Sequence, residues 1–415
     1  MSFHYLKQEL HVEDVPIANI IAEFGSPCYI YSQAILHRQW CAFKQHLLNT
    51  EQICYAVKAN SNLAILARLA KWGAGFDIVS GGELARVMQA GGDPKKTIFS
   101  GVGKTFEEIQ TALQANIGCF NVESEAELLR LETIAKNLHR SASIALRINP
   151  NIDVNTHPYI TTGLKGTKFG ISENDALRLY RRAAQSKYIK ILGISCHLGS
   201  QLTTLDPFLL VIEQLLNLAE QLEKENILLK TINLGGGLGV SYQSEKVPTP
   251  QEYCQQILAT LRGRNSKLNL IIEPGRAITA KAGILVTQIE YLKTNTEKKN
   301  FAIVDAGMND LIRPALYHAE QNILPIVQRH KLPKVNYDVV GPICESSDFL
   351  GKNRQLALQA GDYLAIMDSG AYGFSMSSNY NSRPRPAEIL IDNDQVHLIR
   401  SRETLEQLWK NEKIY

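Results

Sequence analysis

Five residues whose side chains can do chemistry stand at or near the ends of apolar runs. They are Lys58 in "YAVKAN", Asp77 in "GFDIVS", Arg147 in "ALRINP", His197 in "CHLGSQ" and Glu273 in "EPGR". Each has an ordinary structural explanation when taken alone. A lysine can extend to solvent past a strand end, an Asp and an Arg can form a buried pair, and a histidine can be a satisfied core residue. Their shared position at the ends of such runs favours one common reactive site.

Glycine-rich segments follow two of these runs. "GGGLG" covers residues 235–239, and Gly275 and Arg276 come directly after Glu273 and Pro274. Consecutive glycines allow positive φ and close backbone approach, so that successive N–H groups can face an anion. A triple glycine alone can be only a tight turn. Beside an arginine and after a strand, it indicates a phosphate site.

A lysine amine, a phosphate-binding loop and a carboxylate together fit one cofactor, pyridoxal 5'-phosphate. Its aldehyde forms a Schiff base with a lysine, its phosphate needs an anion-binding loop, and its ring nitrogen needs a partner. A carboxylate partner such as Glu273 keeps the ring nitrogen protonated. Since a protonated ring is the stronger electron sink, this residue set indicates loss of carbon dioxide from an amino acid.

The elements that must position these residues follow a repeating plan of apolar run, turn and amphipathic stretch. Eight apolar runs are predicted strands: 53–58, 75–79, 97–101, 119–123, 143–149, 191–198, 231–235 and 268–273. Amphipathic stretches such as "NLAILARLAKW" lie between them, Ser80 and Glu83 have the form of a helix-capping box, and extra loop is expected at 150–170. Eight βα units predict a parallel (β/α)8 barrel of the TIM type, with its reactive site at the carboxyl ends of the strands. A doubly wound open sheet is the alternative.

The pattern changes after about residue 282. Strand-like runs, from "GILVTQIEYLKT" to "AEILIDNDQVHLI", are broken by Gly, Asn, Asp and Pro, and helical periodicity is scarce. We therefore predict a cofactor-binding barrel over residues 36–282. Residues 283–415 are predicted to form a second, mainly β domain, a sandwich or a barrel, with residues 1–35 packed on it.

Composition narrows the class of protein. The chain has 415 residues, of which 45% are hydrophobic and 20% charged, as is typical of a globular protein with two domains. A formal net charge of +3 without a long basic block disfavours nucleic acid as a partner. No apolar run approaches the roughly 18 residues of a membrane span, and the N-terminal residues do not read as a signal peptide. Seven scattered cysteines without a CxxC pair predict no disulfide framework, no metal site and a reducing cytoplasm.

Taken together, the motifs resemble the fold-type III pyridoxal-phosphate decarboxylases, a family that includes ornithine decarboxylase and shares its fold with alanine racemase. The matching segments span residues 55 to 388 in the expected order: "YAVKAN", "GFDIVSGGEL", "GTKFGI", "CHLGSQ", "NLGGGLGV", "EPGRAI", "DAGMNDLIRPALY", "GPICESSD" and "DSGAYGFSMSSNYNSRPRPAE". The resemblance implies a homodimer whose active sites are shared between subunits.

The resemblance also implies a role for each motif residue. Lys58 is the Schiff-base lysine with Asp77 near its amine, His197 stacks on the cofactor ring, and Glu273 is the partner of the ring nitrogen. The remaining cofactor-binding residues are Ser200, Gly235, Gly236, Gly237, Gly275, Arg276 and Tyr372. Cys344, reaching the site from the second subunit, is the acid that returns a proton to Cα.

Charge indicates the substrate within this family. Meso-2,6-diaminopimelate ends in a complete amino acid, so a site that binds it needs cations for one carboxylate and an anion for one ammonium. The residues expected to hold the distal carboxylate are Arg276, Arg313 and Tyr317, and Glu345 would hold the ammonium. Tyr372 is expected to contact the substrate as well as the cofactor. The expected reaction is decarboxylation to L-lysine and carbon dioxide, the last step of lysine biosynthesis.

Two alternatives remain at this point. A related decarboxylase could act on carboxynorspermidine or on another amino acid with a charged distal end. A catalytically inactive binding homologue is disfavoured, because Lys58 and Cys344 are both present.

Overall fold

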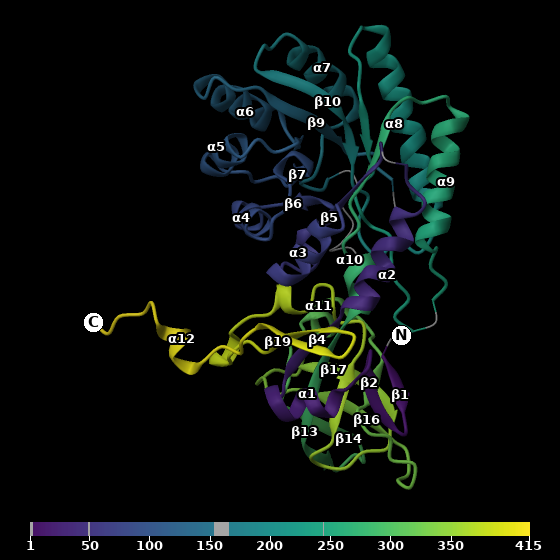
Figure 1. The fold of residues 1–415 in the computed structure, drawn as a ribbon, viewed down its shortest axis with the longest axis vertical. Helices are drawn as coiled ribbons and strands as arrows, with labels where there is room; N and C mark the ends of the chain where they lie inside the picture. The colour runs from purple at the N-terminus through teal and green to yellow at the C-terminus, as the bar shows by residue number, and fades with distance from the viewer. Residues whose placement is uncertain (1–2, 49, 153–165, 244) are drawn as a thin grey trace. The chain divides into compact units, whose positions relative to one another are not determined.

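The structure is a computed structural model that describes residues 3–48, 50–152, 166–243 and 245–415. Most of the extra loop expected at 150–170 lies outside the described residues. The chain divides into two compact units (Figure 1). One comprises Trp40–Val240 and Lys246–Ala277, and the other comprises Met1–Gln39, Ser241–Glu245 and Ile278–Tyr415.

The first unit is a closed barrel of parallel strands in the order β10-β11-β12-β5-β6-β7-β8-β9. The strands are β5 (Gln52–Ala56), β6 (Gly75–Ile78), β7 (Thr97–Phe99), β8 (Cys119–Val122), β9 (Ala142–Ile148), β10 (Ile189–Cys196), β11 (Thr231–Asn233) and β12 (Asn269–Ile272). Each overlaps a predicted apolar run. The TIM-type prediction is therefore confirmed, and the open-sheet alternative is wrong because β12 pairs with β5 and closes the sheet.

A helix follows each barrel strand, and Figure 1 shows these helices outside the strands. They are α3 (Leu63–Lys71), α4 (Gly81–Gln89), α5 (Phe106–Gln114), α6 (Glu125–Asn137), α7 (Glu173–Ala184), α8 (Asp206–Lys224), α9 (Pro250–Gly263) and α10 (Arg276–Thr279). The capping box predicted for α4 is only half formed. Ser80 Oγ accepts the N–H of Glu83, but the Glu83 carboxylate accepts the N–H of Val79. Inside the barrel unit, Cys54, Ile98, Cys119, Ala145 and Ile271 form one buried cluster.

The second unit is mainly β, as predicted. Its sheet has the order β17-β16-β14-β13-β4-β19-β20, and β18 pairs with β13 and β15. The strands are β4 (Cys28–Ser32), β13 (Gly283–Thr294), β14 (Asn300–Val304), β15 (Ile323–Pro325), β16 (Val335–Val340), β17 (Phe349–Leu356), β18 (Tyr363–Ile366), β19 (Ala387–Asp392) and β20 (Gln395–Arg400). The N-terminal strand β4 lies between β13 and β19, so the beginning of the chain completes this sheet.

Smaller elements complete the chain. They are β1 (His4–Leu6), β2 (Glu9–Val12), β3 (Val15–Pro16), α1 (Ile17–Phe24), α2 (Gln33–Lys44), α11 (Arg313–Tyr317) and α12 (Leu405–Trp409). Within the part of the chain that the structure describes, no helix combines the length and the hydropathy needed to cross a membrane.

Candidate active site

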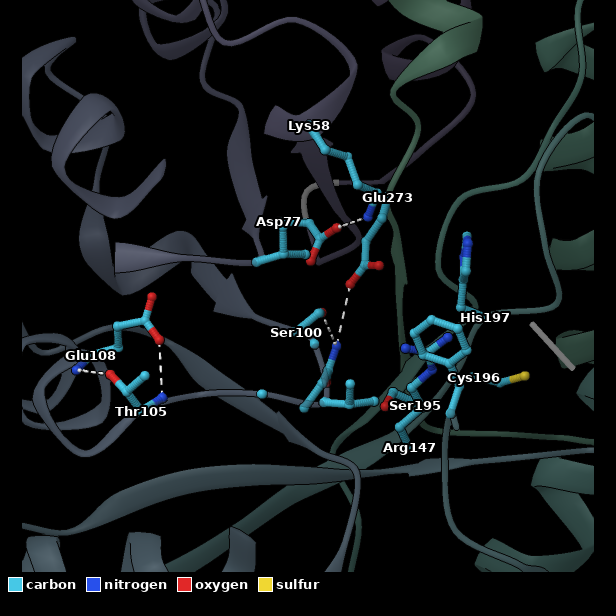
Figure 2. Close-up of a pocket in the computed structure, with 16 residues that line it drawn as sticks. Lys58, Asp77, Ser100, Thr105, Glu108, Arg147, Ser195, Cys196, His197 and Glu273 are labelled. Carbon is cyan, nitrogen blue, oxygen red and sulfur yellow. Dashed lines mark hydrogen bonds and ion pairs between the residues drawn. The ribbon is translucent and has the colours of Figure 1, made fainter. Parts of the chain in front are cut away.

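A cavity of about 600 Å³ lies at the carboxyl ends of the barrel strands, where sites form in this architecture. The polar residues that line it are Lys58, Asp77, Ser100, Thr105, Glu108, Asn121, Arg147, Ser195, His197 and Glu273, which Figure 2 shows in close-up. All five residues singled out at the strand ends are among them. The volume is in the range of about 300–1,000 Å³ that is usual for small-molecule sites.

Lys58 stands beyond its strand. The strand β5 ends at Ala56, and Lys58 belongs to the 3-10 turn Val57–Ala59, so the predicted strand 53–58 was two residues too long. The turn carries the amine to the Asp77 carboxylate, with 2.9 Å between Nζ and Oδ2. The other carboxylate oxygen of Asp77, Oδ1, is buried and has no hydrogen-bond partner among the described residues.

Arg147 does not pair with Asp77, which was the structural explanation offered for the two residues from the sequence. Instead, the Arg147 Nη1 donates to Glu123 Oε1 at 2.8 Å. The buried Glu123 carboxylate also accepts the N–H groups of Gly101 and Gly170. The Arg147 guanidinium lies 4.9 Å from the ring centre of Phe169, so the arginine is held on two sides.

Glu273 is buried between side-chain amides that the sequence analysis missed. Its Oε1 accepts Asn233 Nδ2 at 2.6 Å, and Asn121 Nδ2 lies 3.5 Å away. Burial, and then the charge of Asp77, raises the pKa of Glu273 to about 8. A cationic group beside this carboxylate would oppose both effects. The signal in the sequence was an asparagine within each of two apolar strands, β8 and β11.

His197 follows β10 directly and is held as a neutral ring. The Gly236 N–H donates to its Nδ1 at 3.2 Å, which leaves the proton of the neutral imidazole on Nε2. Desolvation, and then the charges of Arg147 and Lys58, lower the pKa of His197 well below its ordinary value. The ring is therefore uncharged at neutral pH.

The glycine-rich loop packs closely on its neighbours. Gly235 and Gly237 have positive φ values of 66° and 111°. A Cβ on Gly236 would lie 2.4 Å from the carbonyl oxygen of Glu273, and one on Gly237 would lie 2.7 Å from that of Gly199. The loop therefore needs glycine.

Two further predicted residues lie beside this region. The Arg276 Nη2 donates to Ser200 Oγ at 2.8 Å. A Cβ on Gly275 would lie 2.9 Å from the Cβ of Ala59, in the turn that carries Lys58. The barrel unit thus brings together the predicted lysine, carboxylates, imidazole and anion-binding residues.

The other predicted residues belong to the second unit. Arg313 and Tyr317 share helix α11. The buried Arg313 donates to Tyr242 Oη at 2.9 Å, and its guanidinium lies 4.9 Å from the Tyr242 ring centre. Tyr242 was not among the predicted residues, because no motif marks it.

Three more predicted residues of this unit stand on loops. Cys344 and Glu345 are adjacent and exposed. Tyr372 is partly buried and has a positive φ of 56°.

Comparisons with known proteins identify the family. The model of "pyridoxal-dependent decarboxylase, pyridoxal binding domain" matches residues 33–280. The diaminopimelate decarboxylase of Haemophilus influenzae is 53% identical over 98% of this chain and 98% of its own length. That of Vibrio cholerae is 53% identical over 99% of each chain. This chain belongs to the diaminopimelate decarboxylase family.

Solved structures of diaminopimelate decarboxylases show the same fold. The Helicobacter pylori structure, complexed with L-lysine, has a TM-score of 0.91 and 44% identity, and covers 95% of this chain and 99% of its own. The structure from m. jannaschii, in co-complex with L-lysine, has a TM-score of 0.94 and 38% identity, and the match covers 100% of this chain and 98% of that one. The resemblance inferred from the motifs is thereby confirmed, as is pyridoxal phosphate as the cofactor of the family.

The barrel cavity fits this cofactor on three observations. It offers a lysine amine at its wall, a buried and unpaired Asp77 oxygen, and a carboxyl group, Glu273, whose raised pKa a neighbouring cation would lower. The crowded glycine loop and the Ser200–Arg276 pair provide groups suited to a phosphate.

Proposed function

We propose that this protein catalyses the pyridoxal-phosphate-dependent decarboxylation of meso-2,6-diaminopimelate to L-lysine and carbon dioxide, the last step of lysine biosynthesis. The observation that carries the proposal is the identity of about half of all residues, over the full chain, with diaminopimelate decarboxylases. An inactive binding homologue is disfavoured, since these relatives are named as enzymes and both Lys58 and Cys344 are present.

The barrel residues would hold the cofactor. When bound, pyridoxal phosphate supplies an aldehyde that captures the substrate amine and a ring that accepts the electron pair left by departing carbon dioxide. Lys58 would bind the aldehyde, and Glu273 would hold a proton at the ring nitrogen. The neutral His197 would pack on the ring without placing a second positive charge beside that proton. The phosphate would be held by Ser200, Gly235, Gly236, Gly237, Gly275, Arg276 and Tyr372.

The second unit would supply the proton that returns to Cα, and it would bind the distal end of the substrate. Cys344 would return a proton to Cα after the bond from Cα to the carboxylate breaks. Arg313 and Tyr317, with Arg276, would hold the distal carboxylate, and Glu345 would hold the distal ammonium. Tyr372 would also contact the substrate. The ring contact of Arg313 with Tyr242 supports this role, because it keeps the guanidinium in one orientation.

We further propose that the protein is a homodimer with shared sites, in which Cys344 and Glu345 come from the second subunit. Their exposure on the surface of their own unit supports this assembly. We also propose the domain boundaries expected from the sequence, 36–282 for the barrel and 283–415 with 1–35 for the β domain. The two compact units support them.

We also propose a cytoplasmic location. The seven cysteines are all free, as is usual in a reducing compartment.

A substrate panel with product identification tests the function. Purified protein with added pyridoxal phosphate should release lysine from meso-diaminopimelate far faster than it decarboxylates ornithine, lysine or carboxynorspermidine. Faster turnover of carboxynorspermidine would establish the alternative, a related decarboxylase with another charged substrate.

Arg313→Ala separates the substrate role of this arginine from a structural role. Loss of one partner of a desolvated charge pair costs about 2–5 kcal/mol, a drop of roughly thirty- to several-thousand-fold in kcat/KM for diaminopimelate. Lysine and ornithine lack the distal carboxylate, so their slow turnover should not fall. Tyr242→Phe keeps the ring beside Arg313 and removes only the hydroxyl that accepts from it, so a smaller loss confined to diaminopimelate is expected. An equal loss on all three compounds would assign Arg313 to the cofactor or the fold.

A further inference from the structure

The exposed side chain of Glu345 is held at both carboxylate oxygens. The Tyr380 hydroxyl donates to Oε1, and the Ser347 hydroxyl donates to Oε2 at 3.0 Å. An exposed glutamate normally samples several rotamers, because nothing restrains its three side-chain torsions. Two donors from different parts of the chain select one orientation instead. They also lower the pKa of Glu345, so they favour the ionised form that an exposed glutamate already has at neutral pH.

The backbone that carries Glu345 is itself restrained. The loop 341–348 closes on Asp348, whose two carboxylate oxygens accept the N–H groups of Met308 and Ile343, each at 2.7 Å. A Cβ on Gly341 would lie 2.5 Å from Asp348 Oδ2, so the loop leaves no room for a side chain there. The Glu345 carbonyl oxygen accepts the N–H of Asp348 at 3.0 Å.

The segment that carries Tyr380 is also held in place. The Ser378 N–H donates to the carbonyl oxygen of Asn309 at 2.9 Å. Asn379 Nδ2 donates to Glu403 Oε2 at 2.7 Å and to the carbonyl oxygen of Arg383 at 3.1 Å. Tyr380 as a whole residue is 47% exposed, so its hydroxyl is not placed by burial of the side chain in a core. Among the described residues, the bond to Glu345 is the polar contact that orients the hydroxyl.

We propose that Tyr380, assisted by Ser347, is a positioning residue for substrate selection: it holds the Glu345 carboxylate ready for the distal ammonium of the substrate. This inference rests on the proposed function, in which Glu345 binds that ammonium. A carboxylate that is already ionised and oriented binds a cation without first losing rotamer freedom. Because the ammonium is remote from the bond that breaks, the effect falls on binding and leaves the chemical step unchanged.

The test compares Tyr380→Phe with wild type in the cofactor-loaded enzyme. We expect KM for meso-diaminopimelate to rise roughly 2- to 12-fold while kcat stays within about twofold, because the variant must order one free side chain when it binds the substrate. The inhibition constant of 2-aminopimelate, which lacks the distal ammonium, should not change. Tyr291→Phe removes the hydroxyl of another exposed tyrosine of the same unit and should change neither constant. Ser347→Ala should raise KM in the same direction.

Two further readouts separate positioning from a structural role. In a Glu345→Gln background, Tyr380→Phe should add no further loss, because the two residues act through one carboxylate. In the Tyr380→Phe enzyme, the acid limb of kcat/KM should move to higher pH, since loss of the donor raises the pKa of Glu345.

The possible failures are distinguishable. Additive losses in the double variant, or equal weakening of diaminopimelate and 2-aminopimelate, would overturn the positioning role. An unchanged KM in Tyr380→Phe with an active wild type would overturn this inference alone. A wild type that does not decarboxylate diaminopimelate would overturn the proposed function and this inference with it.

Discussion

At the residue scale, the cavity concentrates charges that the cofactor would balance. Asp77 and Glu273 are buried carboxyl groups within one site, and one lysine amine bonds directly to Asp77. Burial and the Asp77 charge both disfavour a second carboxylate, and this is why the pKa of Glu273 rises to about 8. Without the cofactor, Glu273 is therefore largely protonated below that pH.

A consequence for stability follows from this pKa. The unfolded value for glutamate is about 4.3, so between about pH 5 and pH 8 the folded, cofactor-free protein binds more protons at Glu273 than the unfolded chain. Its contribution to the free energy of unfolding then decreases as pH rises through this window. Glu273→Gln abolishes the titration. We compare the thermal midpoints of the cofactor-free variant and the cofactor-free wild type. The difference, variant minus wild type, should be larger at pH 8 than at pH 5.

Differential scanning calorimetry at the two pH values checks this expectation. Glu297→Gln, at an exposed position on the second unit, should leave the pH dependence of wild type unchanged. A difference between Glu273→Gln and wild type that is constant from pH 5 to pH 8 would contradict the raised pKa.

At the scale of elements, the loops after the strands carry the site, and their backbone packing limits what residues they accept. The loop after β11 passes so close to the end of β12 that a side chain at Gly236 would collide with the carbonyl oxygen of Glu273. A main-chain atom at a strand end cannot move aside as a flexible side chain can. The same loop donates its N–H to His197, so its position also decides the state of that ring.

Gly236→Ala is therefore expected to damage the cofactor site more than the fold. Overpacking of this kind costs about 1–3 kcal/mol of stability, and displacement of the loop should weaken pyridoxal phosphate binding by about tenfold or more. Fluorescence titration of the cofactor-free protein measures the affinity. Gly263→Ala is the matched control, because a Cβ at this end of α9 meets no atom within 4 Å. It should leave affinity unchanged and stability equal or slightly higher. Equal affinity in both variants would show that the loop does not bind the cofactor.

At the scale of the whole molecule, the candidate residues are divided between two units. The lysine, the glycine loop and Glu273 lie in the barrel, whereas Cys344, Glu345 and Arg313 lie in the β unit. A dimer with shared sites would join a barrel from one subunit to a loop of the other. This proposal can be tested by mixing two inactive variants, because each subunit would then contribute a different essential group.

Lys58→Ala and Cys344→Ala should each be nearly inactive. The cysteine variant should lose about a hundred- to ten-thousand-fold in rate while it still binds the cofactor. After subunit exchange of an equal mixture, half of the dimers are mixed and each has one intact site, so about a quarter of wild-type activity should return. Native mass spectrometry verifies the exchange. Exchange without recovered activity would favour a site built within one chain.

The sequence by itself determined the barrel, the mainly β second unit and five of the residues that line the cavity. It could do so because strand positions depend on local hydrophobic runs, and because parallel βα units place every strand end on one face. Only the tertiary structure decided the partners: Arg147 bonds to Glu123 and not to Asp77, and Glu273 bonds to Asn233. Such pairings depend on strand register and on barrel closure, which bring together side chains far apart in the chain. The bond from Tyr380 to Glu345 is of the same kind, because it joins two loops that no local pattern relates.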